Sequence, residues 1–223
     1  MRADALSTQE QAWAVAAAAV LGKDGQAVRV RVDQADLAPG TSPSIALTAN
    51  VTTRNLGDRP VWRTVSTTGV LAEPAAAARA GMRITRKFLR DDGGAIDLDT
   101  LRQNTSFVLL LEGKAEDGQD HRVMIAQGLP AGWEIVGRFT EGDAPGMGWL
   151  GKLSATEAQP SADDRFAAVV AVDAGNPGFR VAVRVRAVTP GAFELPGAEA
   201  SDMYRPGVFA RQNAARITVR ATE

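Results

Sequence analysis

The stretch FRVAVRVRAV, residues 179–188, has an apolar side chain at every second position and arginine at three of the positions between them. A side-chain period of two is that of a β-strand. Because one face is apolar and the other largely charged, the pattern predicts an antiparallel strand with one buried and one solvent-facing side. Arg184 and Arg186 share the charged face, which is either a solvated surface or a polar surface that docks a neighbouring domain.

Similar strand patterns, separated by short turns, fill most of the rest of the chain. Many short strands of this kind predict a mainly β protein built as an antiparallel β-sandwich. A second arginine pair, Arg29 and Arg31, is open to the same two interpretations. The predicted strands cover residues 27–32, 44–53, 61–69, 82–89, 106–115, 121–136, 165–172 and 216–221, with turns at 54–60 and 90–94 and a Gly- and Pro-rich loop at 142–151.

Two segments break the strand pattern. Residues 7–22 predict a helix, which Ser7 caps with Glu10 three positions later and which Gly22 ends. Its large apolar residues do not form one narrow stripe, which suits a helix packed on several sides; they are Trp13, Val15, Val20 and Leu21. Residues 73–81, EPAAAARAG, predict a linker and the domain boundary, with a helical turn in the alanines as the alternative.

Composition narrows the functional class. The chain has 223 residues, is 45% apolar and carries a net charge of -1. It can therefore bury a core, and nothing in its charge indicates binding to nucleic acid or to an anionic membrane. No apolar run approaches the roughly 20 residues that span a bilayer, and no signal peptide is predicted within this segment. Cysteine is absent, which excludes thiol nucleophiles and zinc–thiolate sites in this chain.

The ionisable residues predict no catalytic site. The only histidine, His121, begins a predicted strand, and we expect it to be exposed at the strand edge because no Gly-x-Ser-x-Gly elbow accompanies it. Asp163 and Asp164 resemble a carboxylate pair for acid–base work. Because Arg165 and an apolar strand follow, either a strand-entry turn or an Asp–Arg ion pair is the expected structure. We predict that the chain is not an enzyme and binds no cofactor.

A second acidic cluster occupies residues 91–99, DDGGAIDLD. It contains Asp91, Asp92, Asp97 and Asp99. Only the density of acids resembles a calcium-binding loop, because the glutamate at the twelfth position is missing. A solvated hairpin is the expected structure, and no metal site is predicted.

The stretch ASDMYRP, residues 200–206, holds the only tyrosine of the chain. Tyr204 follows Met203 and stands between Asp202 and the pair Arg205-Pro206. The two large, adaptable side chains therefore lie in a short polar loop. What a single tyrosine does there is not decided by the local sequence.

Several of these stretches together resemble the C-terminal segment of bacterial alpha-2-macroglobulins. The motifs of the C-terminal half carry most of the resemblance, with Trp133 replacing the usual phenylalanine in one of them. STQEQAWA, residues 7–14, is similar to the last helix of the family's thioester domain. The other motifs are LPAGWE at 129–134, WLG at 149–151, DDRF at 163–166, RAVTPG at 186–191, FELP at 193–196 and DMYRP at 202–206.

The resemblance implies a domain organisation. Residues 1–22 would be the last helix of a thioester domain, and residues 23–72 the second half of a CUB-like β-domain that the thioester domain interrupts. Residues 73–223 would form the C-terminal macroglobulin-like β-sandwich. The parent would be a much longer bacterial protein in the periplasm, with any signal or lipid anchor upstream of this segment.

The resemblance also implies a function. Such proteins are protease traps, in which cleavage of a bait region exposes a thioester that captures the protease. Met203 and Tyr204 would shield that thioester, and Asp202, Arg205 and Pro206 would support their loop. The partners would be the thioester domain of the same parent chain and, through the full-length protein, target proteases, without nucleic acid or membrane insertion. Two alternatives stay open: Tyr204 as a tyrosine corner of its own sandwich, and the chain as a secreted adhesion module.

Overall fold

We analysed a computed structural model of the chain, which describes residues 8–23, 27–38, 44–46, 50–66, 68–69, 73–142, 144, 146–160 and 162–222. The chain forms two compact units, Met1–Val70 and Leu71–Glu223. Each unit is described by itself below. The assignment of residues 1–22, 23–72 and 73–223 to the three family domains stays a prediction.

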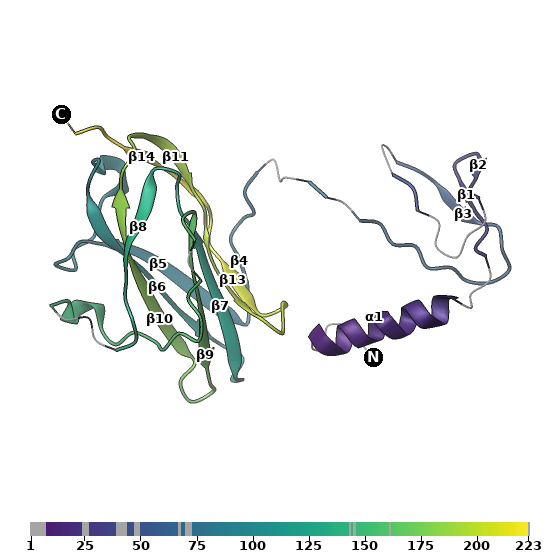
Figure 1. The fold of residues 1–223 in the computed structure, drawn as a ribbon, viewed down its shortest axis with the longest axis horizontal. Coiled ribbons are helices and arrows are strands. Elements are labelled where there is room, and N and C mark those ends of the chain that lie inside the picture. The colour runs from purple at the N-terminus through teal and green to yellow at the C-terminus, as the bar shows by residue number, and fades with distance from the viewer. Residues whose placement is uncertain are drawn as a thin grey trace. The chain divides into compact units, whose positions relative to one another are not determined.

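The described residues of the first unit form one helix and one small sheet (Figure 1). Helix α1 spans Thr8–Lys23, while the predicted cap Ser7 lies outside the described residues. Its large apolar side chains are exposed around the helix, including Trp13 and Leu21. No helix among the described residues is long and apolar enough to cross a membrane. Strands β1 (Val30–Val32), β2 (Ala35–Asp36) and β3 (Thr53–Asn55) form an antiparallel sheet in the order β2-β1-β3.

Two strands predicted in the first unit are largely wrong. Of residues 44–53, only Thr53 is in a strand, and residues 47–49 lie outside the described part. Residues 61–66, 68 and 69 belong to no strand, although their sequence alternates. A strand needs a neighbour that accepts and donates its backbone hydrogen bonds. The described part of this unit offers such neighbours only to three very short strands.

The second unit is the predicted antiparallel β-sandwich (Figure 1). One sheet has the order β5-β6-β10-β8 and the other the order β4-β13-β12-β7-β9, and β11 pairs with β14. The 3₁₀ helices η2 (Leu98–Thr100) and η3 (Gly148–Leu150) lie in the connections. The strands are β4 (Ala78–Ala80), β5 (Met82–Leu89), β6 (Ser106–Ala115), β7 (His121–Gly128), β8 (Trp133–Arg138), β9 (Arg165–Val172), β10 (Gly178–Ala187), β11 (Gly191–Leu195), β12 (Ala198–Asp202), β13 (Phe209–Arg211) and β14 (Ala215–Val219).

The main core is made by the apolar faces of both sheets. Alternate residues of β6 and β10, such as Phe107 and Val183, are fully buried in one cluster with Ile125 of β7 and Phe166 of β9. Trp133 packs edge-on against Phe107, with 4.9 Å between the ring centroids. The period of two in FRVAVRVRAV therefore predicts the inward face of β10 correctly.

The outward face of β10 is not simply solvated, as the arginine pattern had suggested. Val108, Leu110 and Ala182 are buried on that face, beneath Met147 and Leu150 of the Gly- and Pro-rich loop. Arg184 binds the turn after β5, with Nη1 2.6 Å from Asp91 Oδ1 and 2.8 Å from Asp91 Oδ2. The loop thus adds a third layer over the sheet, and Arg184 is used inside the domain.

Residues 73–81 are not only a linker. Ala78–Ala80 forms β4, which pairs with β13 and lies at the edge of the five-stranded sheet. The segment is held by Ala77 N, which donates to Asn213 Oδ1 at 2.6 Å, and by Arg211 Nε, which donates to Ala76 O at 3.1 Å. These partners are more than 130 residues away, and their hydrogen bonds override the helical tendency of the alanines.

A substitution at Gly113 of β6 would test the packing between the strands. A Cβ atom at this position would lie 2.1 Å from Phe179 Cζ and 2.4 Å from the Arg83 carbonyl oxygen. We expect Gly113→Ala to lower the free energy of unfolding by about 3 kcal/mol, because a buried ring and a backbone atom must both move. Urea unfolding measures this loss.

The matched control is Gly148→Ala, where an added Cβ atom meets nothing within 4 Å. It should change the free energy of unfolding by less than about 1 kcal/mol. Equal effects of the two variants would contradict the packing described for β6.

Candidate functional site

The loop that carries Met203 and Tyr204 connects β12 to β13. Its ends are joined by Asp202 N, which donates to Val208 O at 2.9 Å. Inside it, Val208 N donates to Arg205 O at 2.8 Å, which closes a turn with Pro206 at the position where proline is favoured. Met203 N donates to Arg122 O of β7 at 2.9 Å. The backbone of this loop is therefore fixed to the sheet.

The Asp202 carboxylate organises the loop from below. Its side chain is buried, and Oδ1 accepts hydrogen bonds from Tyr204 N and Arg205 N, both at 2.7 Å. Oδ2 lies 3.2 Å from Arg205 Nη2. Asp202 and Arg205 thus form an ion pair whose carboxylate is buried. A buried carboxylate needs such a full set of donors.

His121 lies beneath the same loop, and its predicted exposure at a strand edge is wrong. The residue is only 4% exposed. Its Nδ1 lies 2.7 Å from Asp202 Oδ2, and its Nε2 lies 2.7 Å from Asp117 Oδ1. The ring therefore joins the end of β12 to the turn between β6 and β7. We refer to Asp117, His121, Asp202 and Arg205 as the His121 cluster.

Arg205 completes the attachment of the loop. Its guanidinium donates to Gln119 Oε1 and to the backbone oxygen of Asp120, both in the turn between β6 and β7. Arg205 Nη2 also lies 2.9 Å from His121 Nδ1. Two segments about 85 residues apart in the sequence are thereby locked together.

Met203 and Tyr204 point outward from this anchored base. They are 42% and 45% exposed, as the shielding hypothesis requires when the surface they cover is not part of the chain. Within the described residues, the Tyr204 hydroxyl makes no hydrogen bond. A tyrosine corner needs that bond to its own backbone, so the described structure does not support that alternative.

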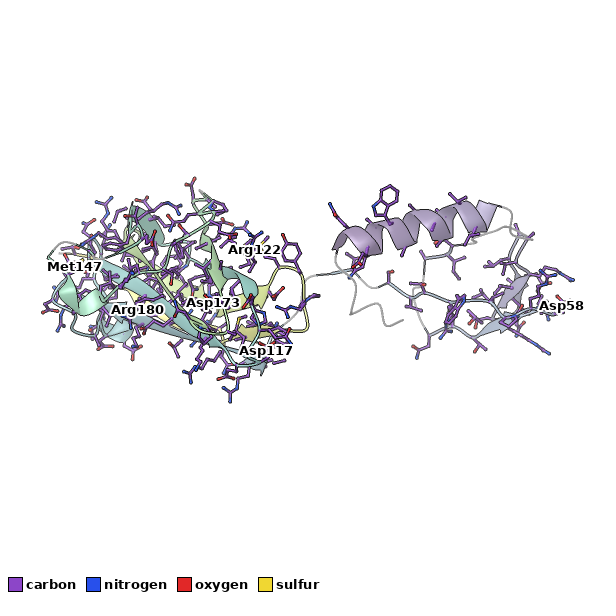
Figure 2. All side chains as sticks on the ribbon, turned by 90° about the horizontal axis from the view of Figure 1, so that it is seen from below. Asp58, Asp117, Arg122, Met147, Asp173 and Arg180 are labelled. Atoms are coloured by element: carbon purple, nitrogen blue, oxygen red, sulfur yellow. The ribbon has the colours of Figure 1, made fainter. Side chains whose placement is uncertain are left out.

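An open groove of about 490 Å³ lies beside the loop. Tyr204 and Arg205 line one part of it, and residues at the end of β9, including Asp173, line another. Figure 2 labels Arg122 and Asp173 of this groove and Asp117 of the His121 cluster, and it places Met147 well away from Asp117. The outer loop around Met147 is thus a separate feature.

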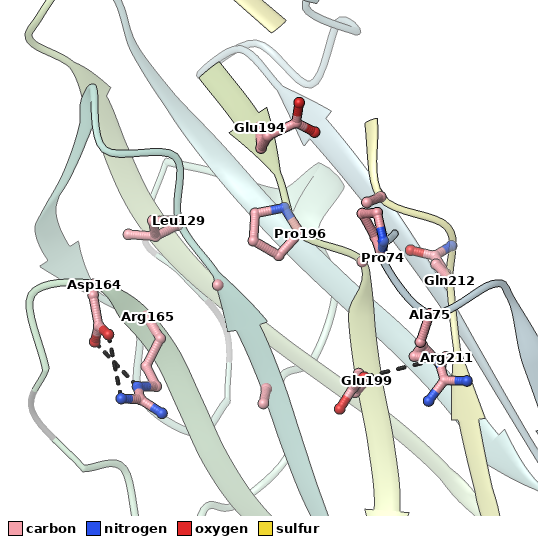
Figure 3. A pocket seen from close by; sticks show the side chains of 14 residues that line it. Pro74, Ala75, Leu129, Asp164, Arg165, Glu194, Pro196, Glu199, Arg211 and Gln212 are labelled. Carbon is pink, nitrogen blue, oxygen red and sulfur yellow. Dashed lines mark hydrogen bonds and ion pairs between the residues drawn. The ribbon is translucent and has the colours of Figure 1, made fainter. Parts of the chain in front are cut away.

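A second groove, of about 570 Å³, runs along β12 (Figure 3). Asp164 lies in it and is paired with Arg165, with 3.1 Å between Oδ1 and Nε, which confirms the predicted ion pair. Arg211 is 4.0 Å from Glu199 across the same groove. The charged groups that Figure 3 connects by dashed lines are therefore paired with one another, and none is a free acid or base beside a nucleophile.

The acidic stretch 91–99 forms the predicted hairpin, closed by a bridge between Leu89 and Ala95. It is not simply solvated, because Asp91 pairs with Arg184 and Asp97 caps η2 by accepting from Asp99 N. Among the residues that the structure describes, no group of three or more His, Cys, Asp or Glu side chains could hold a metal ion.

The His121 cluster perturbs the two carboxylates in the same direction. The hydrogen bond from His121 lowers the pKa of Asp117. For Asp202, burial alone would raise the pKa, but the hydrogen bonds from Tyr204 N, His121 and Arg205 N, with the charge of Arg205, lower it. Both groups are therefore held as anions.

A family comparison identifies this domain. The model of the bacterial alpha-2-macroglobulin MG10 domain matches residues 81–207, more than half of the chain and including Met203 and Tyr204. The chain belongs to the bacterial alpha-2-macroglobulin family. The sandwich is accordingly a macroglobulin-like domain.

Known members of the family agree in sequence and fold. The alpha-2-macroglobulin of Escherichia coli strain K12 is 30% identical over a match of 162 residues, which covers 68% of this chain and 10% of that protein. This chain thus spans about a tenth of the curated relative. Native E. coli alpha-2-macroglobulin from domain MG7 to the C-terminus has a TM-score of 0.73 at 23% identity, covering 96% of this chain and 36% of that one. Salmonella alpha-2-macroglobulin reacted with methylamine has a TM-score of 0.72 at 22% identity, with coverages of 96% and 14%.

Asp202 gives a direct test of the anchored loop. We expect Asp202→Asn to lower the free energy of unfolding by about 3 kcal/mol, because the buried His121 and Arg205 lose their anionic partner. Asp164→Asn removes a carboxylate from an exposed pair and should cost less than about 1 kcal/mol. Urea unfolding of both variants measures the difference. Similar costs would show that the His121 cluster does not hold the loop.

The lowered pKa values predict a loss of stability in acid. The contribution of Asp117 and Asp202 is complete above the ordinary aspartate pKa of about 3.9 and is lost as pH falls through their lowered values. The free energy of unfolding, measured between about pH 5 and pH 2, should therefore fall more steeply in the native sequence than in Asp202→Asn. Other carboxylates titrate equally in both proteins, so parallel pH profiles would contradict this assignment.

Proposed function

We propose that this chain is the C-terminal segment of a bacterial alpha-2-macroglobulin protease trap. Its role is noncatalytic: it shields a thioester in the parent protein and docks against other domains of the same parent chain. The chain contains no cysteine and therefore cannot form the thioester itself. The periplasmic location and the capture of target proteases belong, in this proposal, to the full-length protein.

The observation that carries the proposal is an exposed pair on a fixed base. Met203 and Tyr204 leave much of their surface open, although the backbone beneath them is held by the β7 strand, Asp202 and Arg205. A loop that is ordered before it binds loses little conformational entropy on docking. Exposure and rigidity together suit a surface that meets another domain in a defined position.

The two side chains fit the chemistry of a shield. A thioester is an activated acyl group, and its useful lifetime depends on excluding water and small nucleophiles until capture. Tyr204 offers a flat apolar ring with a polar end, which suits the boundary between a dry contact and solvent. Met203 is unbranched and adaptable, and it can fill the irregular space beside the ring.

The first unit supports docking to other domains. Trp13 and Leu21 of α1 are exposed, and Trp62 is fully exposed. Large apolar side chains left open in this way mark surfaces that contact other protein. We infer that α1 belongs with further helices of a thioester domain and that the short strands of this unit belong with further strands of a CUB-like domain.

A relative supports the reactive-group assignment. The Salmonella protein that shares this fold has been crystallised after reaction with methylamine. Methylamine is a small amine nucleophile, the type of reagent that cleaves a thioester to an amide and a free thiol. The same reaction in the parent of this chain would report how well the thioester is shielded.

The test is the rate of thiol release by methylamine in the full-length protein. Tyr204→Ala should raise this rate roughly tenfold, as expected if the ring contributes about 1.4 kcal/mol to excluding the nucleophile. Tyr204→Phe keeps the ring and should retain most of the protection. An unchanged rate in Tyr204→Ala would reject the shielding role.

Val136→Ala is the matched control. Val136 lies on β8 and is 41% exposed, close to the 42% of Met203. Its truncation should leave thiol release unchanged, whereas Met203→Ala should accelerate it. A general loosening of the protein would affect all these variants alike.

A further inference from the structure

We propose that His121 is the positioning residue of the Met203–Tyr204 loop and that it acts as an imidazolium ion bridging Asp117 and Asp202. The purpose of this arrangement rests on the proposed function, whereas the contacts that support it all lie within this domain. It makes the placement of Tyr204 dependent on the protonation of one buried ring. His121 and Tyr204 are each the only residue of their kind in the chain.

The distances define the charge state of the ring. Each ring nitrogen lies 2.7 Å from a carboxylate oxygen, Nδ1 from Asp202 and Nε2 from Asp117. A neutral imidazole has one N–H donor and one lone pair. One of the two contacts would then place a lone pair against a carboxylate oxygen. Only the doubly protonated ring donates to both, at distances typical of charge-assisted hydrogen bonds.

Neither Asp117 nor Asp202 is expected to be protonated and to donate to a neutral ring in place of the imidazolium ion. Asp202 already accepts Tyr204 N, Arg205 N and the Arg205 guanidinium, and Asp117 accepts Gln119 N at 3.2 Å. Hydrogen bonds of this kind favour the ionised carboxylate. The buried members of the His121 cluster, His121 and Asp202, then form a neutral pair, while Asp117 and Arg205 keep part of their surface in solvent.

The alternative to the imidazolium ion is a neutral ring that accepts a hydrogen bond from Arg205. Arg205 Nη2 lies 2.9 Å from His121 Nδ1 and could donate to it if that nitrogen carried no proton. The ring would then be neutral, with its only proton on Nε2 facing Asp117. In that case the 2.7 Å contact between Nδ1 and Asp202 Oδ2 would set a lone pair against the carboxylate, and the buried carboxylate would lose a charged donor. With a doubly protonated ring, Nδ1 and Arg205 Nη2 are instead two donors that share Asp202 Oδ2.

The charged groups around the ring, beyond its own strand, come from three segments. Asp117 and Asp120 belong to the turn between β6 and β7, Asp202 and Arg205 to the loop after β12, and Asp173 follows β9 in the adjoining groove. Arg122 follows His121 on β7 and pairs with Glu157 on its own side of the strand. None of these groups except Asp117, Asp202 and Arg205 contacts the ring.

The consequence for the loop is mechanical. Asp202 Oδ1 holds Tyr204 N and Arg205 N, while Oδ2 is held by His121. When the ring loses its proton, one of its two bridges is lost and the Asp202 carboxylate loses a donor. Asp202 Oδ2 would then be held by Arg205 alone, while Oδ1 keeps the two backbone donors of the turn. Loss of the bridge between His121 and Asp202 should therefore change the environment of Tyr204.

Nuclear magnetic resonance of the whole 223-residue chain tests this directly, with ¹⁵N-labelled histidine and ¹³C-labelled tyrosine. Each label gives one residue's signals, so no assignment is needed. Near pH 7, both ring nitrogens of His121 should carry a proton. As pH is raised, any loss of the second ring proton should be accompanied by a shift of the Tyr204 ring signal. A ring that keeps both protons, with an unchanged Tyr204 signal, also upholds the bridge.

Two charge variants sharpen the result. Asp117→Asn removes the anion that contacts Nε2, and the signal of that ring nitrogen near pH 7 should shift. Asp173→Asn removes the same charge from the adjoining groove without contacting the ring, and the ring signals should move much less. Circular dichroism of both variants verifies that the sandwich is folded.

Two outcomes would overturn the proposal: a neutral ring with a single N–H near pH 7, or a Tyr204 signal that does not move while His121 titrates. Both are visible in the native sequence, so a variant that fails to fold does not obscure the answer. The test involves no thioester. Its failure therefore leaves the shielding role to the methylamine experiment, and failure of that experiment leaves an anchored loop that covers something else.

Discussion

The arrangement of the candidate site depends on one buried anion, the carboxylate of Asp202. A buried carboxylate without partners is strongly disfavoured, so every nearby segment must bring a donor to it. Tyr204 N and Arg205 N come from the loop itself, and His121 comes from the start of β7. The loop and the turn between β6 and β7 therefore fix each other. Without Asp202, the local sequence gives no reason for Tyr204 to hold one position.

The sandwich beneath the loop is itself cross-linked by a polar contact. Arg86 of β5 points inward, and its Nη1 donates to Gln127 Oε1 at 2.9 Å and to Pro196 O at 2.5 Å. Burial lowers the pKa of Arg86. Gln127 lies on β7, in the opposite sheet and on the same strand as His121. A strand tied to both sheets is a rigid base for the site, as a precisely placed surface requires.

Local sequence was a good guide where the partner of each residue was another apolar side chain. The strands 82–89, 106–115 and 165–172 were predicted with their observed bounds, because period-two alternation needs only a core to face. The domain's family and the loop at 203–206 followed from motif resemblance. Polar partners were harder to predict. His121 was expected to be exposed, because the sequence around it does not indicate that Asp202, 81 residues away, would be its partner. Backbone partners were hardest to predict. Strand β4 was not expected, and residues 61–66, 68 and 69 form no strand although one was predicted there.

Met203 and Tyr204 are unusual residues for the tip of a surface loop. Loop tips generally carry small or polar residues and remain mobile. Here a network of two carboxylates, a histidine and an arginine orders a loop whose outermost side chains are two large apolar ones. Neither side chain adds to the core of its own domain, so their position does not stabilise this fold. In the function proposed above, the anchoring serves a surface outside this domain that Met203 and Tyr204 meet in register.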